Sequence, residues 1–444
     1  MTTVTVMGRT DRVQMTIPES WSAEDIRDEI ELLAIFKGRE GVFAPNLVVT
    51  VNPYEGSMAE FMGTAVGNIV QTLSDVRIID ISTWNRTEEF PLELAAQGRS
   101  ITYTHISPAS GEVLRATDWI FIEGGLAVQA TGTTAAPDWM VFAADMEAIA
   151  SSLITSEAES ADRPVDMTLP EGAEDELASA ELGQPVESIG GLTKQQPYDY
   201  SGEWVLAPAI ALVDEMAEGF KVGRLQAADF EQELQELNRV GFAEGTTLTD
   251  LGELVRRHLA DPMASFRVSA AGSAGETYYQ AWVHGTTVLV AAGAGYHVQT
   301  GLQPDQAPTP DHVNIMILPL TALARDIAAW IGVGPAWPLP VLPAKISLMQ
   351  FGQRWAGNTE PPEDSNAVLR ELWKQNWFTW NMHAQGEESS PEEYSYLHGG
   401  PLGQFRIGTE GDQTWLIPTH SVYAFDQLDD VVAAAVYDRP LRLT

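Results

Sequence analysis

The 444-residue chain contains no cysteine. This absence excludes disulfide bonds, thiolate nucleophiles and cysteine-ligated zinc together. No run of 18 apolar residues occurs, so no transmembrane helix is expected. The first ten residues lack the basic segment and following apolar segment of a secretory signal, so we expect a cytoplasmic location.

Basic residues are scarce. The chain has 25 Lys and Arg against 62 Asp and Glu, which gives a formal net charge of −37. Proteins bind nucleic acids by neutralising phosphates, so this balance argues against a DNA or RNA partner. The acidity fits either a surface that repels other acidic surfaces or an acidic bias of the whole proteome, and both interpretations stay open.

Motifs for catalysis and for metal or cofactor binding are missing as well. The His residues never pair as His-x-x-x-His, and neither a Gly-x-Ser-x-Gly elbow nor a Gly-x-x-x-x-Gly-Lys loop occurs. The Gly-rich residues 293–301 follow a strand and precede no helix, which is typical of a hairpin turn. His420, Tyr423 and Asp426 are compatible with an acid–base set, but a loop histidine before a helix is far more common. We therefore predict a protein that is not an enzyme, without catalytic residue, cofactor or metal.

An acidic segment divides the chain. Residues 157–203 hold 12 acidic residues against Arg163 and Lys194, and no aromatic side chain occurs before Tyr198. Such a segment buries too little apolar surface to offset the entropy of ordering it. We predict a flexible acidic linker between one domain at 1–156 and another at 204–444.

The first domain has the pattern of strands and helices in alternation. Residues 45–51 read as a buried strand, and apolar residues between 58 and 70 recur at the spacing of one helical face. Five further strands and a closing helix at 137–153 follow. The fold class that we expect is α+β, beginning with a three-layer α/β/α sandwich whose sheet is mostly antiparallel.

The second domain shows one order of elements twice. In 204–334, helices beginning with one at 204–220 precede a strand meander and a closing helix. In 335–444, helices beginning with one at 347–355 precede a second meander and a closing helix. Sequence identity between these lobes is negligible, so the order of elements is the evidence. We predict a two-lobed α+β module with a duplicated antiparallel sheet and helices.

Four large aromatic residues fall within eight positions: Trp373, Trp377, Phe378 and Trp380. Core packing is the ordinary explanation. The alternative is that one or two of them line a partner groove, because aromatic side chains dominate interface energetics. The adjacent loop contains Glu387 and Glu388 and is either a solvated hairpin tip or a steering patch for a basic partner. These six residues are the predicted partner-binding set.

The first domain resembles the LpqN/LpqT-like proteins of actinobacteria. The resemblance rests on Ile17-Pro-Glu-Ser-Trp21, on Phe43-Ala-Pro-Asn-Leu-Val-Val-Thr-Val51 and on the closing segment 149–153. It implies the three-layer fold shared with PsbP, and a binding role without catalytic residues. Members of that family are often lipoproteins with a lipobox cysteine, which this chain lacks.

The second domain resembles the EspG-like chaperones of type VII secretion. The similar pieces are Leu237–Phe242, Leu259-Ala-Asp-Pro262, Gln280-Ala-Trp-Val283, and Gly403–Gly408 with Thr414–Pro418. This resemblance implies a cytosolic adaptor that holds a helical hairpin of a secreted substrate, of the WXG-type or PE/PPE-like kind. The appended PsbP-like domain departs from that family and leaves the substrate open.

Our leading hypothesis is therefore a non-enzymatic protein-binding adaptor or secretion chaperone. One alternative is a winged-helix-like transcriptional regulator that uses 226–292, where Arg239, Arg256 and Arg257 would contact phosphates. The surrounding acidity and a meander larger than a wing argue against it. A second alternative is a small-ligand-binding protein.

Overall fold

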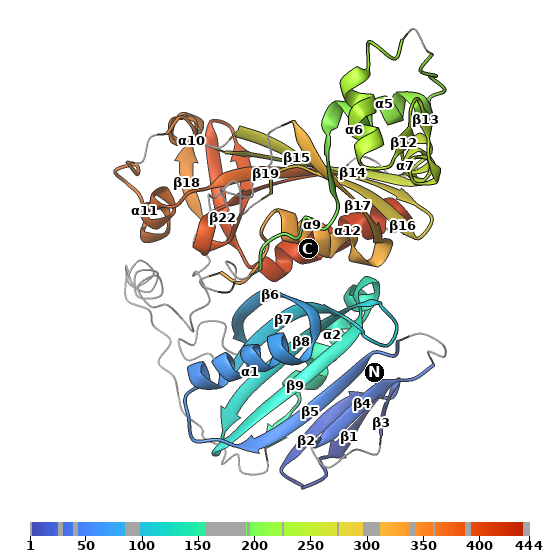
Figure 1. The fold of residues 1–444 in the computed structure, drawn as a ribbon. Helices are drawn as coiled ribbons and strands as arrows, with labels where there is room; N and C mark the ends of the chain where they lie inside the picture. Colours follow the sequence, from blue (N-terminus) through green and yellow to red (C-terminus); the bar gives the residue numbers. More distant parts are fainter. Residues whose placement is uncertain are drawn as a thin grey trace. The chain divides into compact units, whose positions relative to one another are not determined.

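The computed structural model describes residues 2–24, 30–38, 43–84, 98–155, 192, 196–223, 226–272, 275–295, 311–336, 343–357, 360–386 and 392–437. The chain divides into two compact units (Figure 1). The first comprises Met1–Leu192, Gly334–Pro340 and His420–Val422. The second comprises Thr193–Val333, Val341–Thr419 and Tyr423–Thr444.

The first unit consists mainly of strands. Its described elements are β1 (Thr3–Met7), β2 (Val13–Pro18), β3 (Trp21–Ala23), β4 (Leu32–Phe36), β5 (Asn46–Pro53), α1 (Met58–Thr72), β6 (Ser74–Trp84), β7 (Gly98–Ile106), β8 (Val113–Glu123), β9 (Leu126–Ala135), the 3-10 turn η1 (Ala136–Asp138), α2 (Trp139–Ser151) and β10 (Ile154–Thr155). Helix α1 begins with a capping box. The Ser57 hydroxyl accepts a hydrogen bond from the Glu60 backbone N–H, and the Glu60 carboxylate accepts one from the Ser57 N–H.

A seven-stranded antiparallel sheet, in the order β3-β4-β5-β9-β8-β7-β6, separates two layers of helix. Successive residues of a strand point to opposite faces. On β8, Ile120 packs in one cluster with Ile69 of α1, whereas Trp119 and Phe121 pack in another with Met146 of α2. Because α1 and α2 cover opposite faces, the three-layer α/β/α sandwich is confirmed.

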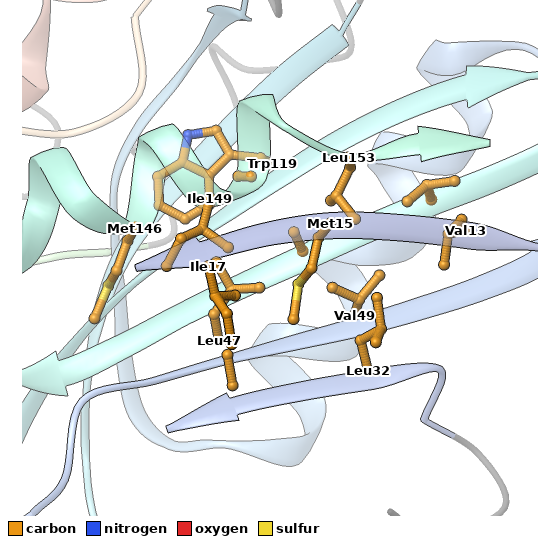
Figure 2. Packing of buried hydrophobic residues seen from close by; sticks show 14 of the residues in the cluster. Val13, Met15, Ile17, Leu32, Leu47, Val49, Trp119, Met146, Ile149 and Leu153 are labelled. Atoms are coloured by element: carbon orange, nitrogen blue, oxygen red, sulfur yellow. The ribbon is translucent and has the colours of Figure 1, made fainter. Parts of the chain in front are cut away.

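The core beneath α2 also includes a small second sheet, in the order β1-β2-β10. Figure 2 shows Met15 and Ile17 of β2 close to Leu47 and Val49 of β5. Met15, Leu47 and Val49 have no exposed surface. Full burial of such a side chain contributes about 1.5–3 kcal/mol, so β2 is held to the sandwich mainly by this apolar contact.

The second unit contains helices and one large sheet. Its first half consists of β11 (Glu203–Leu206), α5 (Ala207–Ala217), α6 (Glu231–Arg239), β12 (Ala243–Glu244), β13 (Thr247–Leu248), α7 (Asp250–Ala260), β14 (Ala264–Gly272), β15 (Gly275–His284), β16 (Thr287–Ala292), β17 (His312–Pro319), the 3-10 turn η4 (Leu320–Ala322) and α9 (Leu323–Trp330). Its second half consists of β18 (Ala344–Ser347), α10 (Leu348–Trp355), α11 (Ala367–Lys374), β19 (Phe378–Gly386), β20 (Glu392–His398), the 3-10 turn η5 (Gly400–Leu402), β21 (Gln404–Glu410), β22 (Gln413–Thr419) and α12 (Ser421–Tyr437).

Ten of the described strands of this unit form an antiparallel sheet in the order β11-β17-β16-β15-β14-β19-β20-β21-β22-β18, and β12 and β13 form a separate two-stranded sheet. The two halves follow the same plan. Each begins with an edge strand that pairs with the last strand of its own meander, β11 with β17 and β18 with β22. The first meander strands, β14 and β19, pair with each other, with Val268 opposite Met382. The predicted duplication is confirmed, and the two lobes are halves of one continuous sheet.

The described end of the predicted linker folds with the second unit. Tyr198 is buried, and its hydroxyl donates a hydrogen bond to Oδ2 of Asp326 in α9 at 3.0 Å. Tyr279 donates to the same oxygen at 2.8 Å. Residues 157–191 and 193–195, the rest of that predicted linker apart from Leu192, lie outside the described residues.

Candidate functional site

The predicted aromatic residues lie inside the second unit. Trp373, Trp377, Phe378 and Trp380 expose between 1% and 8% of their surfaces. Trp380 stacks on Tyr396 with ring centroids 4.7 Å apart. This placement favours core packing for all four rings, and their contact with a partner stays a prediction. Glu387 and Glu388 lie outside the described residues.

Two helices cover one face of the ten-stranded sheet. Tyr279 of β15 packs against Trp330 of α9, with ring centroids 5.7 Å apart. Tyr396 of β20 donates a hydrogen bond to Gln427 of α12. The register places Tyr279 and Tyr396 on the same face as Val268, so α9 and α12 shield this face in both halves.

The other face is covered only towards its two ends. At one end, Leu289 of β16 and Ile315 of β17 share a core cluster with residues of α5, α6 and α7. At the other end, Leu372 of α11 and Phe405 of β21 both approach Gly399. A Cβ atom placed there would lie 2.6 Å and 2.9 Å from their side chains. Two helical groups therefore flank the middle of this face.

The middle of the face is polar and exposed, and we call it the open face. It consists of the outward side chains of β14, β15 and β19 that lie between the two helical groups. Arg267, Asn381 and His383 are exposed, and Arg267 lies opposite His383 across the pairing of the two halves. The Arg267 guanidinium lies 4.3 Å from the centre of the Tyr278 ring. The Ser269 hydroxyl donates a hydrogen bond to Asn381 Oδ1 at 2.7 Å.

The open face differs in charge from the chain as a whole. Strands β14 and β19 contain no Asp or Glu, although the chain has 62 acidic residues. A hydrogen bond with Glu276 raises the pKa of Tyr278 above its usual value, so this phenol stays neutral at physiological pH. Strand β15 adds one exposed carboxylate to this face, Glu276, which offsets the charge of Arg267. The open face therefore has little net charge, unlike the chain as a whole, and it can accept hydrogen-bonding groups.

Sequence reasoning did not identify Arg267, Asn381 or His383 as site residues. A signal was present, because polar residues alternate with buried apolar ones in both strands. That alternation identifies an outward face of each strand. It does not reveal which helices cover the face.

Two carboxyl groups, Asp118 and Asp326, accept hydrogen bonds from buried tyrosines. In the first unit, Asp118 accepts hydrogen bonds from Tyr103 and Gln129, and burial raises its pKa to about 7. In the second unit, Asp326 accepts the two tyrosine hydroxyls described above. Within the described ranges, no group of three or more His, Asp or Glu side chains is arranged to hold a metal ion. Across the same ranges, no helix has the length and apolar character needed to cross a membrane.

The arginines of the regulator alternative make contacts within the protein. Arg239 pairs with Glu236 and donates to the Trp204 carbonyl, and Arg256 pairs with Glu253 at 2.8 Å. Strands β14–β16, where a wing would fall, are part of the ten-stranded sheet. Phosphate binding would have to displace these carboxylates, so this surface is poorly prepared for nucleic acid.

No protein-family model matches the chain, and no curated protein matches it. Solved structures with a similar fold include cyanobacterial PsbP from Synechocystis sp. PCC 6803, with 12% identity over 34% of this chain and 92% of that chain and a TM-score of 0.25. LpqN, involved in cell envelope biogenesis of Mycobacterium tuberculosis, has 10% identity over 34% and 89%, with a TM-score of 0.26. The Ran-binding protein Mog1p of Saccharomyces cerevisiae has 7% identity over 34% and 87%, with a TM-score of 0.24.

The sequence of the first domain resembles LpqN-like proteins, which share the fold of PsbP, and both proteins are among these similar structures. At such low identities and TM-scores, these likenesses assign no function to the chain. The EspG-like resemblance of the second domain stays a prediction.

Proposed function

We propose that this chain is a non-enzymatic adaptor that binds another protein through the open face. The proposal rests on β14 and β19, whose outward sides carry exposed polar residues but no acidic ones. Their outward side chains are mostly polar, include the exposed Arg267, Asn381 and His383, and carry no carboxylate in a chain of net charge −37. Polar side chains keep such a face stable in water until a partner supplies hydrogen bonds and excludes solvent.

The dimensions of the open face support a helical partner. Strands lie about 4.8 Å apart and rise about 3.3 Å per residue, so three strands of nine or ten residues present a strip roughly 10–15 Å wide and 30 Å long. A helix of about 20 residues has a diameter of about 10 Å and a length of about 30 Å. One helix, or one arm of a helical hairpin, therefore fits between the flanking helical groups.

Within this class we propose a cytoplasmic secretion chaperone of an actinobacterium. Its client would be the helical hairpin of a WXG-type or PE/PPE-like protein. Support comes from the repeated order of elements and from the EspG-like sequence pieces of the second domain. The absence of sequence motifs for catalysis and metal binding agrees with an adaptor.

Binding of the full chain to purified helical-hairpin secreted proteins from its host, measured by calorimetry, tests this proposal. We expect Arg267→Glu to weaken binding at least about tenfold, because it places a carboxylate at the centre of the face. Arg406→Glu is the matched control, because Arg406 is exposed on the opposite face of the same sheet. Equal affinities for Arg267→Glu and the unaltered chain would exclude the open face as the binding site.

A further inference from the structure

Helix α10 carries an apolar surface that lies far from the open face in the strand order. Leu348, Met349 and Trp355 are 50%, 69% and 43% exposed, and no residue of this helix is fully buried. With Gly352 between them, these three side chains form what we call the α10 patch. Isolated apolar side chains are common on protein surfaces, whereas several on one short helix are a feature of binding sites.

The α10 patch is held rigidly from behind. A capping box between Ser347 and Gln350 starts the helix, with the Ser347 N–H donating to Gln350 Oε1 at 2.8 Å. The Arg354 guanidinium donates to the Gln375 carbonyl at 2.7 Å. Trp355 contacts Phe351 and Trp377, with ring centroids 6.4 Å away in both cases. The half-buried Phe351 and the buried Trp377 therefore hold one exposed indole in place, which lowers the entropy lost when a partner binds it.

In the first half of the unit, the helix equivalent to α10 is α5, and another helix packs against it. Helices α5 and α10 each follow their edge strand without an intervening residue. In the first half the next helix, α6, packs with α5 in one core through its buried Leu234 and Leu237. Between α10 and α11, the described residues contain no helix. Among the described residues, the second half therefore has no helix between α10 and the helix before its meander, where the first half has α6.

The outward residues of α5 are small or polar, whereas those of α10 are large and apolar. The first, second and eighth positions are Ala207, Pro208 and Asp214 in α5, all exposed. In α10 these positions are Leu348, Met349 and Trp355. The surface of α5 is suited to water, whereas that of α10 is suited to an apolar partner.

The negative net charge of the chain favours a basic partner over an acidic one. A net charge of −37 repels a second copy of the chain and repels an anionic membrane, but attracts a basic protein. We propose that the α10 patch is a docking site for a cationic amphipathic helix of another protein. This site is separate from the open face and does not depend on the function proposed for it.

Gly352 gives the α10 patch its shape. It lies four residues after Leu348 and three before Trp355, so all three share one face of the helix. Among the described residues, a Cβ added at Gly352 would have no neighbour within 4 Å. An apolar side chain of the docking helix enters this notch and contacts Leu348 and Trp355 on either side.

The test uses the full chain and a fluorescein-labelled 14-residue helical peptide with Leu on one face and Lys on the other. Fluorescence anisotropy measures binding to the unaltered chain and to the double variant Met349→Ser with Trp355→Ser, which leaves the charge unchanged. We expect the double variant to bind at least tenfold more weakly. Gly352→Leu fills the notch and is expected to weaken binding by a similar factor.

The matched control is Leu251→Ser with Met263→Ser, because both residues are 44% exposed in the first half of the same unit. We expect unchanged affinity for this control and for Arg267→Glu, which separates the α10 patch from the open face. Equal binding by the α10 double variant and its control would overturn the proposal. Loss of dimerisation in the double variant, or loss of its binding to vesicles of phosphatidylcholine and phosphatidylglycerol, would also overturn it by assigning the patch to another occupant.

Discussion

The two halves of the second unit have the same strand order but differ in how deeply their outer helices are buried. In the first half, α5, α6 and α7 enclose a core, and α5 alone buries Ala209, Ile210, Leu212 and Val213. In the second half, α10 buries no residue fully. The duplicated plan thus supplies one half that is complete by itself and one whose outer helix exposes apolar side chains. This difference is the basis on which we propose a docking site in the second half.

Trp373→Ala should have the largest effect on stability. Trp373 is 1% exposed in α11, and removing a buried Trp side chain costs about 3–5 kcal/mol. Trp355→Ala in the same half should cost less than about 1.5 kcal/mol, because that indole is partly in water. Urea unfolding of both variants measures the difference. Similar losses would mean that the α10 patch is part of the core and would remove the contrast between the halves.

Gly252→Ala should destabilise the first half by about 3 kcal/mol. A Cβ at this position of α7 would lie 1.9 Å from the Phe242 carbonyl oxygen, and this backbone atom cannot move without disturbing the turn before β12. Thermal unfolding followed by circular dichroism measures the loss. An unchanged melting temperature would show that α7 and the turn before β12 are not tightly packed against each other.

Asp118→Asn should change the stability of the first unit alone and so distinguish its unfolding transition from that of the second unit. Burial raises the pKa of Asp118 to about 7, so the folded state holds this proton more tightly than the unfolded state. Stability contributed by the protonated carboxyl is present at low pH and falls as the pH rises from about 4 to 7. We therefore expect the variant to be more stable than the unaltered chain by up to about 4 kcal/mol at pH 8 and nearly equal to it at pH 4.

Scanning calorimetry across this pH range checks the Asp118 prediction. Only the transition of the first unit should shift between the two proteins, so the remaining heat can be assigned to the second unit. A stability difference independent of pH would contradict the raised pKa. A shift of every transition would show that the two units unfold together.

Gly352→Ala should have the smallest effect, and of opposite sign to Gly252→Ala. The added methyl group meets no neighbour in the described part of the chain, and Ala is favoured over Gly inside a helix by about 1 kcal/mol. We expect a gain of about 0.5–1 kcal/mol in urea unfolding. A loss of stability would mean that the space above α10 is already occupied by part of this chain.

Much of the fold follows from local patterns in the sequence. Apolar residues at helical spacing predict α1, and the repeated order of helices, meander and closing helix predicts the duplication. The predicted helix at 204–220 was wrong at its start, because Glu203–Leu206 form strand β11. Those residues pair with β17 more than 100 positions away, with Glu203 opposite Ile315. Local propensity carries no information about such a partner.

The candidate sites were harder to predict from the sequence than the fold. The aromatic cluster at 373–380 attracted attention by its density, yet its side chains are buried, and the exposed indole of the neighbourhood is Trp355. Whether an aromatic side chain is core or surface depends on what packs over its helix or strand. In α10 and β19, those neighbours come from distant parts of the chain.

The sequence by itself determined the α+β composition and the inward and outward sides of strands such as β14 and β19. The acidic linker between two domains stays a prediction. Side-chain periodicity and charge are properties of a local stretch and can be read without a fold. Only the tertiary structure decided that β14 pairs with β19, which joins two meanders into one sheet with an open centre. It likewise decided that α10 has no helix among the described residues in the place that α6 takes beside α5. Exposure depends on contacts between segments far apart in the chain, and those contacts exist only once the chain has folded.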